Sequence, residues 1–193
     1  MHVEFRRTGE RRYGVTVRRE PLPPVEIGSI GYDPSMPHDL ALLIVESELG
    51  LAHGIFGFIA EGGDSGGSPH LAPGEDRRAA ARRRSKASRR DEKLMRKGAR
   101  SDGDASERAA YVCGYEWLRR SKDPERRKRA AAMADGVRIT LEKMDARERS
   151  AYTEEALARV CARMDELSAR WARLGVGDSL VVEWAVRRRP SRR

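Results

Sequence analysis

Four polar side chains lie within or just after the most apolar stretch of this 193-residue chain, and their types could bind a metal ion. His38, Asp39 and Glu46 fall within the segment MPHDLALLIVESELG, and His53 follows it after a few residues. Imidazole and carboxylate groups are ordinary ligands of zinc and iron. Asp39 and Glu46 are seven residues apart, so they share one side of a helix. The pattern keeps open a metal-dependent enzyme, or a degenerate relative of one, centred on these four residues.

The same four residues also fit a purely structural role. The segment contains neither an H-E-x-x-H motif nor two histidines at positions i and i+4. In that interpretation Asp39 caps the helix, and Glu46 faces solvent or pairs with an arginine. The histidines would satisfy nearby backbone groups. We therefore expect no cofactor, with a divalent metal as the alternative.

A second set of candidates is the strongly basic segment from Arg77 to Arg100. It holds twelve basic and two acidic residues, a local charge of +10 in a chain whose net charge is +9. Residues 187–193 add five arginines, which leaves the remainder mildly acidic at −6. Guanidinium groups match phosphate geometry, and counterion release from a nucleic acid favours binding. The expected nucleic-acid-binding residues are Arg77, Arg78, Arg82, Arg83, Arg84, Lys86, Arg89, Arg90, Lys93, Arg96, Lys97 and Arg100.

This basic segment contains no aromatic residue, so we expect no base stacking from it. Binding would follow the backbone of RNA or DNA with little sequence preference. An acidic protein surface is an equally suitable partner for such a segment, and a solvated connector is the alternative. Alanine and arginine occur on all faces, so both a solvated helix and a flexible connector stay open. The expected function is non-enzymatic binding.

The two ends of the chain predict the sheet that supports these residues. Val3 and Phe5 alternate with polar residues, as do residues 13, 15 and 17, which predicts a β-hairpin with its turn at residues 8–10. Alternation over residues 180–186 predicts a strand with one buried face. A lone strand leaves its backbone groups unpaired, so this strand should join the hairpin in one antiparallel sheet.

Helix signals fill the middle of the chain. Pro37 and Gly50 suit the first position and the end of a buried helix, and a short helix should follow over residues 55–60. Later helices are predicted from Ser106 and Thr153 as N-caps, and from Pro124 as a first helical residue. We predict a single α+β domain over 1–186, with its small antiparallel sheet packed by about four to five helices. It carries a basic insertion at 64–104 and a disordered basic tail at 187–193.

The composition also limits where this chain is expected to act. No run of 18 apolar residues is present, so we expect no transmembrane helix and no membrane partner. The N-terminus lacks the apolar stretch of a signal peptide. Cys113 and Cys161 are isolated, which is typical of buried thiols in a reducing compartment. These observations predict a cytoplasmic protein.

Three segments carry a resemblance to a known family. They are PHDLALLIVESELGLAHGIFG, SERAAYVCGYEWL and the ending YTEEALARVCARMDELSARWARLGVGDSLVVEW. They resemble an uncharacterised family of small bacterial proteins, mainly actinobacterial. The resemblance covers most of the chain and implies an intracellular bacterial protein whose two ends form one unit. Relatives often have a histidine at the position of Leu42, giving H-D-x-x-H; this chain departs from that pattern, and the family has no established activity to transfer.

Overall fold

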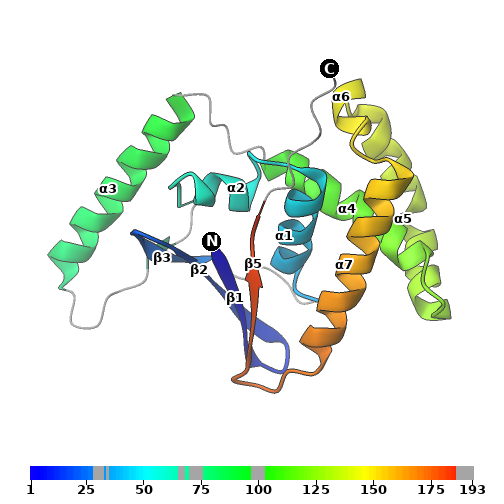
Figure 1. Ribbon diagram of the computed structural model, residues 1–193, viewed down its shortest axis with the longest axis horizontal. Helices are drawn as coiled ribbons and strands as arrows, with labels where there is room; N and C mark the ends of the chain where they lie inside the picture. Colours follow the sequence, from blue (N-terminus) through cyan, green and yellow to red (C-terminus); the bar gives the residue numbers. More distant parts are fainter. Residues whose placement is uncertain (28–32, 34, 65–67, 70–75, 97–102, 186–193) are drawn as a thin grey trace.

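The computed structural model describes residues 1–27, 33, 35–64, 68–69, 76–96 and 103–185. They form an α+β fold in which helices cover one face of an antiparallel sheet (Figure 1). The sheet has five strands in the spatial order β4-β3-β2-β1-β5. The strands are β1 (His2–Gly9), β2 (Arg12–Arg19), β3 (Leu22–Ile27), β4 (Ser68–Pro69) and β5 (Ser179–Glu183).

The described helices comprise five long ones and two short ones. The long helices are α1 (His38–Leu49), α3 (Arg77–Arg96), α4 (Gly103–Arg119), α5 (Pro124–Lys143) and α7 (Glu154–Ala172). The short helices are α2 (Ile55–Ala60) and α6 (Ala146–Arg149). The predicted α+β fold, in which both ends of the chain share one small sheet, is confirmed.

The hairpin of β1 and β2 follows from the alternation of apolar residues. Val3 pairs with Val17 and Phe5 with Val15, and all four side chains are buried. β1 continues to Gly9, so the turn lies at residues 10–11, and the predicted turn at 8–10 is wrong. The register shifts just before Gly9, and such a bulge lets the strand continue past one unpaired residue.

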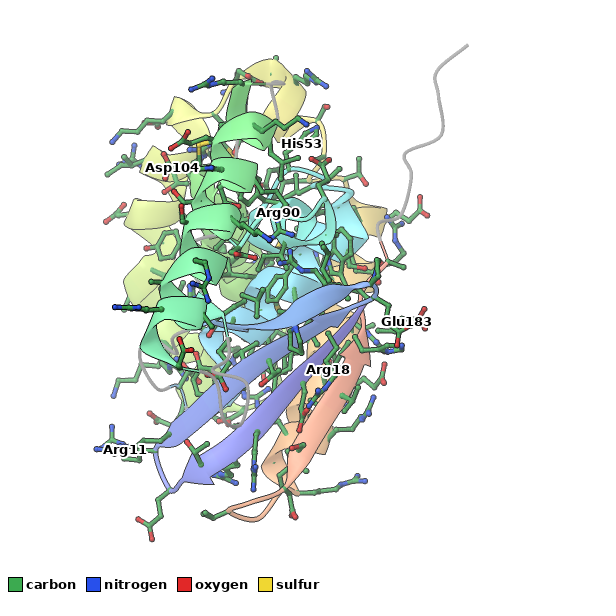
Figure 2. The ribbon with its side chains drawn as sticks, turned by 90° about the vertical axis from the view of Figure 1, so that its left-hand side faces the viewer. Arg11, Arg18, His53, Arg90, Asp104 and Glu183 are labelled. Atoms are coloured by element: carbon green, nitrogen blue, oxygen red, sulfur yellow. The ribbon has the colours of Figure 1, made fainter. Side chains whose placement is uncertain are left out.

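β5 completes the sheet by pairing antiparallel with β1. Leu180 and Val182 lie opposite Phe5 and Val3 and are buried with them. On the other face, Arg18 of β2 forms an exposed ion pair with Glu4 of β1, 3.1 Å apart. Figure 2 shows this second face of the sheet open to solvent. β5 ends at Glu183, so the predicted strand over residues 180–186 is wrong at residues 184 and 185; residue 186 lies outside the described residues.

α1 is the most completely buried helix of the core. It begins directly after Pro37 and is followed by Gly50, whose φ of 70° is the left-handed conformation of a helix C-cap. It contacts both α4 and α7. Because these helices surround it, apolar residues on every side of α1 are buried, as the sequence predicted; they are Leu40, Leu42, Leu43, Ile44, Val45 and Leu49.

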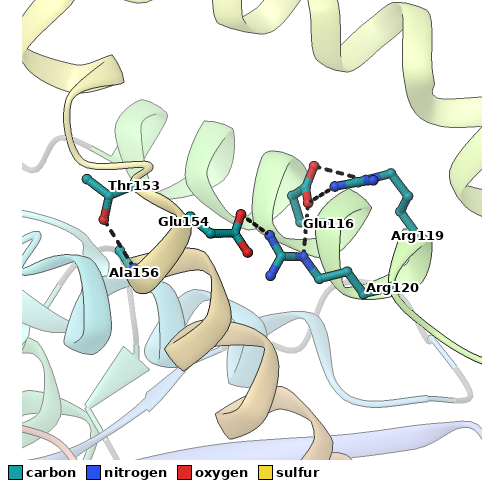
Figure 3. Close-up of polar contacts among 6 residues, drawn as sticks. All are labelled: Glu116, Arg119, Arg120, Thr153, Glu154 and Ala156. Carbon is teal, nitrogen blue, oxygen red and sulfur yellow. Dashed lines mark hydrogen bonds and ion pairs between the residues drawn. The ribbon is translucent and has the colours of Figure 1, made fainter.

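Caps and ion pairs fix the ends of the surrounding helices. Thr153 caps α7 by accepting the backbone N–H of Ala156 at 3.2 Å, as predicted (Figure 3). In the same view Arg120, directly after α4, binds Glu116 of α4 and Glu154 of α7, at 3.2 and 2.8 Å. This arginine therefore joins the end of α4 to the start of α7.

The predicted N-cap of α4 is wrong. α4 begins at Gly103, and Ser106 lies inside the first turn with its side chain fully buried. Its hydroxyl donates a hydrogen bond to Glu46 of α1, 2.9 Å away, so it serves a contact between helices. A serine three residues inside a helix can bond to a neighbouring element because its hydroxyl has no capping role there.

Both cysteines are buried thiols, as the sequence predicted. Cys113 and Cys161 are free and buried. Burial raises the pKa of the Cys161 thiol to about 11. In the described part of the chain, no helix is both long and apolar enough to cross a membrane.

Candidate nucleic-acid interface

Most of the predicted basic segment is one regular helix. α3 covers Arg77–Arg96, which settles the choice between a helix and a flexible connector for these residues. Figure 1 shows α3 at the β3–β4 edge of the sheet, apart from α4, α5 and α7. Some expected ligands fall outside the described residues. These are the whole residues Lys97 and Arg100, and the side chains of Arg77, Arg83 and Arg84.

Six cationic side chains of α3 form a continuous row, which we name the basic stripe. They are Arg78, Arg82, Lys86, Arg89, Lys93 and Arg96, and each is exposed. Their steps of three and four residues place all six within an arc of about 80° on a helix of 3.6 residues per turn. At 1.5 Å per residue the stripe is about 27 Å long. α3 therefore presents one straight cationic edge to solvent.

One acidic residue lies beside the basic stripe, near its C-terminal end. Glu92 is exposed and lies beside the stripe, 3.9 Å from Arg96 in the next turn. An exposed pair at this distance contributes little to stability and is screened by salt. It leaves the other five cations of the stripe as a single-sign surface.

The side of α3 away from the stripe attaches the helix to the body. Arg90 and Asp91 are only partly exposed, and both bind Asp64, which is buried just after α2. Nη2 of Arg90 lies 3.8 Å from Oδ2 of Asp64, and Oδ1 of Asp91 accepts the backbone N–H of Asp64 at 3.0 Å. Figure 2 shows Arg90 between α3 and the body. Arg90, an expected nucleic-acid ligand, thus lies at the attachment of α3.

Asp64 also binds Arg19, the last residue of β2. The guanidinium of Arg19 donates to the Asp64 carboxylate and to the backbone carbonyls of Ile59 and Gly63. Its side chain is 5% exposed, and this burial lowers the pKa of the guanidinium while Asp64 opposes the effect. We name Arg19, Asp64, Arg90 and Asp91 the Asp64 cluster.

The Asp64 cluster was not predicted from the sequence, although the position of Arg19 on β2 indicates part of it. Residues 13, 15 and 17 of β2 face the core. Because side chains on a strand alternate between its two faces, residue 19 lies on this inward face as well. An inward arginine requires a buried acceptor. The partner could not be identified from the sequence, because Asp64 lies 45 residues away in what looks like an ordinary polar loop.

The four expected metal ligands are engaged by separate partners. Nε2 of His38 lies 3.0 Å from a carboxylate oxygen of Glu107, with both side chains about half exposed. Nδ1 of His53 lies 3.7 Å from Glu61, again at the surface. Within the described ranges, no group of three or more His, Cys, Asp or Glu side chains could hold a metal ion. The structure therefore does not gather these residues into a metal centre.

Asp39 has a different role from the predicted helix cap. Pro37 is the N-cap of α1, and no side chain caps this end. Asp39 is buried and accepts a hydrogen bond of 2.7 Å from the hydroxyl of Tyr13 on β2. Burial raises the pKa of this carboxyl, with the Tyr13 hydrogen bond acting against the rise. Asp39 thus connects α1 to the sheet.

Glu46 is the most unusual of the four, because its side chain is 0% exposed. One oxygen accepts the backbone N–H groups of Phe56 and Gly57 at 2.9 and 3.0 Å, and the other accepts the Ser106 hydroxyl. The expectation that Glu46 faces solvent or pairs with an arginine is wrong. Burial raises the pKa of this carboxyl to about 7, although these hydrogen bonds favour its ionised form.

Comparisons of the chain with protein-family models, with curated proteins and with solved structures give no match. The function must therefore be argued from the charge and geometry of this molecule.

Proposed function

We propose that this protein is a binding module that holds nucleic acid by its phosphate backbone, using the basic stripe of α3. The observation that carries the proposal is the alignment of six exposed cations along one side of one helix. A straight cationic edge about 27 Å long can follow several successive phosphates. Each neutralised phosphate releases counterions, which supplies sequence-independent affinity.

The attachment of α3 supports this proposal. Arg90 and Asp91 are drawn toward Asp64, which leaves the stripe on a different side of the helix. The residues available for contact are arginine and lysine without an aromatic neighbour in the helix. Recognition would therefore depend on charge and not on base stacking.

Two further parts of the proposal concern the setting of the protein. We place it in the cytoplasm, because its two cysteines are free and buried, as suits a reducing compartment. We also assign it to the family of small bacterial proteins that it resembles. The three resembling segments contain α1, most of α4, and α7 with β5, which together supply much of the core. α3 lies outside those segments.

A salt titration of binding to duplex DNA and to single-stranded RNA tests the function. If all six stripe residues contact phosphates, the logarithm of the binding constant should fall with log salt at a slope of about −5 for duplex DNA and about −4 for a single strand. A triple variant, Arg82→Gln, Lys86→Gln and Arg89→Gln, should reduce the duplex slope to about −3 and weaken binding at every salt concentration.

A matched variant separates the stripe from net charge. Arg12→Gln, Arg147→Gln and Arg173→Gln remove three exposed positive charges from other parts of the surface. This variant should bind nearly as the unmodified protein does. Equal weakening by both triple variants contradicts the proposal. If neither nucleic acid binds at low salt but polyglutamate does, the partner is an acidic protein surface instead.

A further inference from the structure

A cavity of about 270 Å³ lies among the helices that pack beside the sheet. It is bordered by the start of α1, by α4, by α5 and by Met164 of α7. α4 contacts α1, α5 and α7 directly, and Figure 1 shows these helices grouped on the side of the molecule away from α3. The cavity is therefore separate from the basic stripe and needs its own explanation.

The inner wall of this cavity is apolar and polarisable. Met36, Met133 and Met164 contribute thioethers, and Trp117 contributes a ring whose Nε1–H is already bound to Asp165 at 2.7 Å. Methionine adapts to irregular shapes and makes favourable contacts between sulfur and aromatic rings. An engineered apolar cavity of about 150 Å³ holds a benzene molecule. A space nearly twice that size suits a ligand with two fused aromatic rings.

Gly114 keeps the cavity open. It lies within α4, between Glu107 and Leu118, which also border the cavity at helical spacing. A Cβ atom built at Gly114 meets no other atom within 4 Å, so the backbone packs against nothing that requires glycine there. Glycine inside a helix costs about 1 kcal/mol relative to alanine. Its absent side chain leaves space for a guest.

Polar groups gather at the mouth of the cavity. His38 and Glu107 form one pair, and Arg129 of α5 forms another with Asp33. The Arg129 side chain is 47% exposed and binds Asp33 through Nη2. A guanidinium has five N–H donors, so a second carboxylate can bind it beside the first. A further cation, Arg126, lies 4.6 Å from the centre of the Trp117 ring.

We propose that this cavity binds a small aromatic carboxylate. The ring system occupies the methionine-lined wall beside Gly114, and the carboxylate lies at the mouth within reach of Arg129. This arrangement follows the common design of ligand pockets, in which an apolar interior fixes the body and a few polar groups fix its orientation. Binding here is independent of nucleic acid.

Methyl NMR of the six methionines can locate such a ligand directly. With naphthalene-1-carboxylate as the probe, the methyl signals of Met36, Met133 and Met164 should shift in a saturable way. Met1, Met95 and Met144 do not border the cavity and serve as internal references. The matched amine, 1-naphthylmethylamine, should bind at least about tenfold more weakly, since it cannot accept hydrogen bonds from Arg129.

Variants test the two parts of the site separately. Gly114→Leu should abolish the shifts by filling the cavity, whereas Gly114→Ala should fold normally and raise Tm by about 2–4 °C. Arg129→Gln should weaken naphthalene-1-carboxylate about tenfold but should not weaken the amine, because the variant removes a positive charge and frees the Asp33 carboxylate; Lys128→Gln, an exposed neighbour, should alter neither.

Three results would overturn the proposal. One is the absence of any saturable shift at millimolar probe. Another is an equal response of all six methionines, which indicates non-specific contact. The third is equal affinity for acid and amine.

Discussion

Replacing Glu46 by glutamine should remove a large part of the pH dependence of stability. The carboxyl is 0% exposed, and burial raises its pKa from the ordinary 4.5 to about 7. At about 1.4 kcal/mol per pKa unit, this difference corresponds to roughly 3 kcal/mol. The direction of the pH dependence follows from where the proton binds. Below about pH 4.5, Glu46 is protonated in both the folded and the unfolded chain, so its burial carries no charge penalty. As the pH rises from about 4.5 to about 7, the unfolded chain loses this proton while the folded chain keeps it, so stability falls across that range.

Glutamine can replace this carboxyl because Ser106 is both a donor and an acceptor. The amide oxygen can accept the N–H groups of Phe56 and Gly57, as one carboxylate oxygen of Glu46 does now. The amide nitrogen then faces the Ser106 hydroxyl, which can rotate to accept a hydrogen bond. We therefore expect Glu46→Gln to fold with the same contacts and without a buried charge.

Urea unfolding at about pH 5 and about pH 8 measures the effect. Relative to the unmodified protein, the free energy of unfolding of Glu46→Gln should rise by about 2–3 kcal/mol between these two pH values. Comparison of the two proteins is essential, because burial also raises the pKa of Asp39 and adds a slope of the same sign to both. Glu155→Gln removes an 87% exposed carboxylate and should leave the pH dependence unchanged.

Two results would refute this reasoning. One is a constant difference between Glu46→Gln and the unmodified protein at both pH values. The other is a loss from Glu46→Gln as large as that from Glu46→Ala. The alanine variant leaves two buried N–H groups without their acceptor, at about 1–3 kcal/mol each, and provides the scale for that comparison.

Further predictions concern the Asp64 cluster, a glycine contact and a helix cap. Asp64→Ala should cost about 3–5 kcal/mol in urea unfolding, because it leaves the buried guanidinium of Arg19 without its carboxylate; a loss below 1 kcal/mol would show that the pair is dispensable. Gly57→Ala should prevent native packing of α2, since its Cβ would lie 2.0 Å from the carbonyl oxygen of Ala52, and near-native Tm would contradict this. Thr153→Ala should lower stability by about 1 kcal/mol, measured by thermal unfolding, through loss of the α7 cap.

The parts of the fold that sequence reasoning predicted are those governed by periodicity. Alternation with period two identified the inward face of β1 and β2, and the need of a final strand for a partner placed β5 in the same sheet as this hairpin. An apolar run without a polar side identified α1 as buried. Such patterns are local, because the geometry of a single strand or helix decides which of its residues face the core.

The buried polar contacts could not be predicted from such local patterns, because they join residues that are far apart in the sequence. Glu46 finds Ser106 sixty residues later, and Asp39 finds Tyr13 on a strand. His38 and His53 were predicted as metal ligands because of their residue type. In the fold, each instead pairs with a carboxylate at the surface. For the basic segment, composition predicted charge but not the alignment of six cations, which depends on helix formation over α3.

Two of the buried charged groups, Glu46 and Arg19, together explain how a six-residue helix is held in place. α2 is far too short to be stable alone, and a helix leaves N–H groups unpaired at its start and carbonyls at its end. Glu46 accepts the N–H groups at the start of α2, and Arg19 binds the carbonyl of Ile59 near its end.

Arg19 extends this restraint toward α3. The same guanidinium binds Gly63 and Asp64, and Asp64 contacts α3 through Arg90 and Asp91. A buried ion pair of this kind adds little net stability compared with apolar packing, but its geometry can select one arrangement. The position of the basic stripe relative to the core therefore depends on the placement of α2, which joins the apolar centre of the molecule to its charged edge.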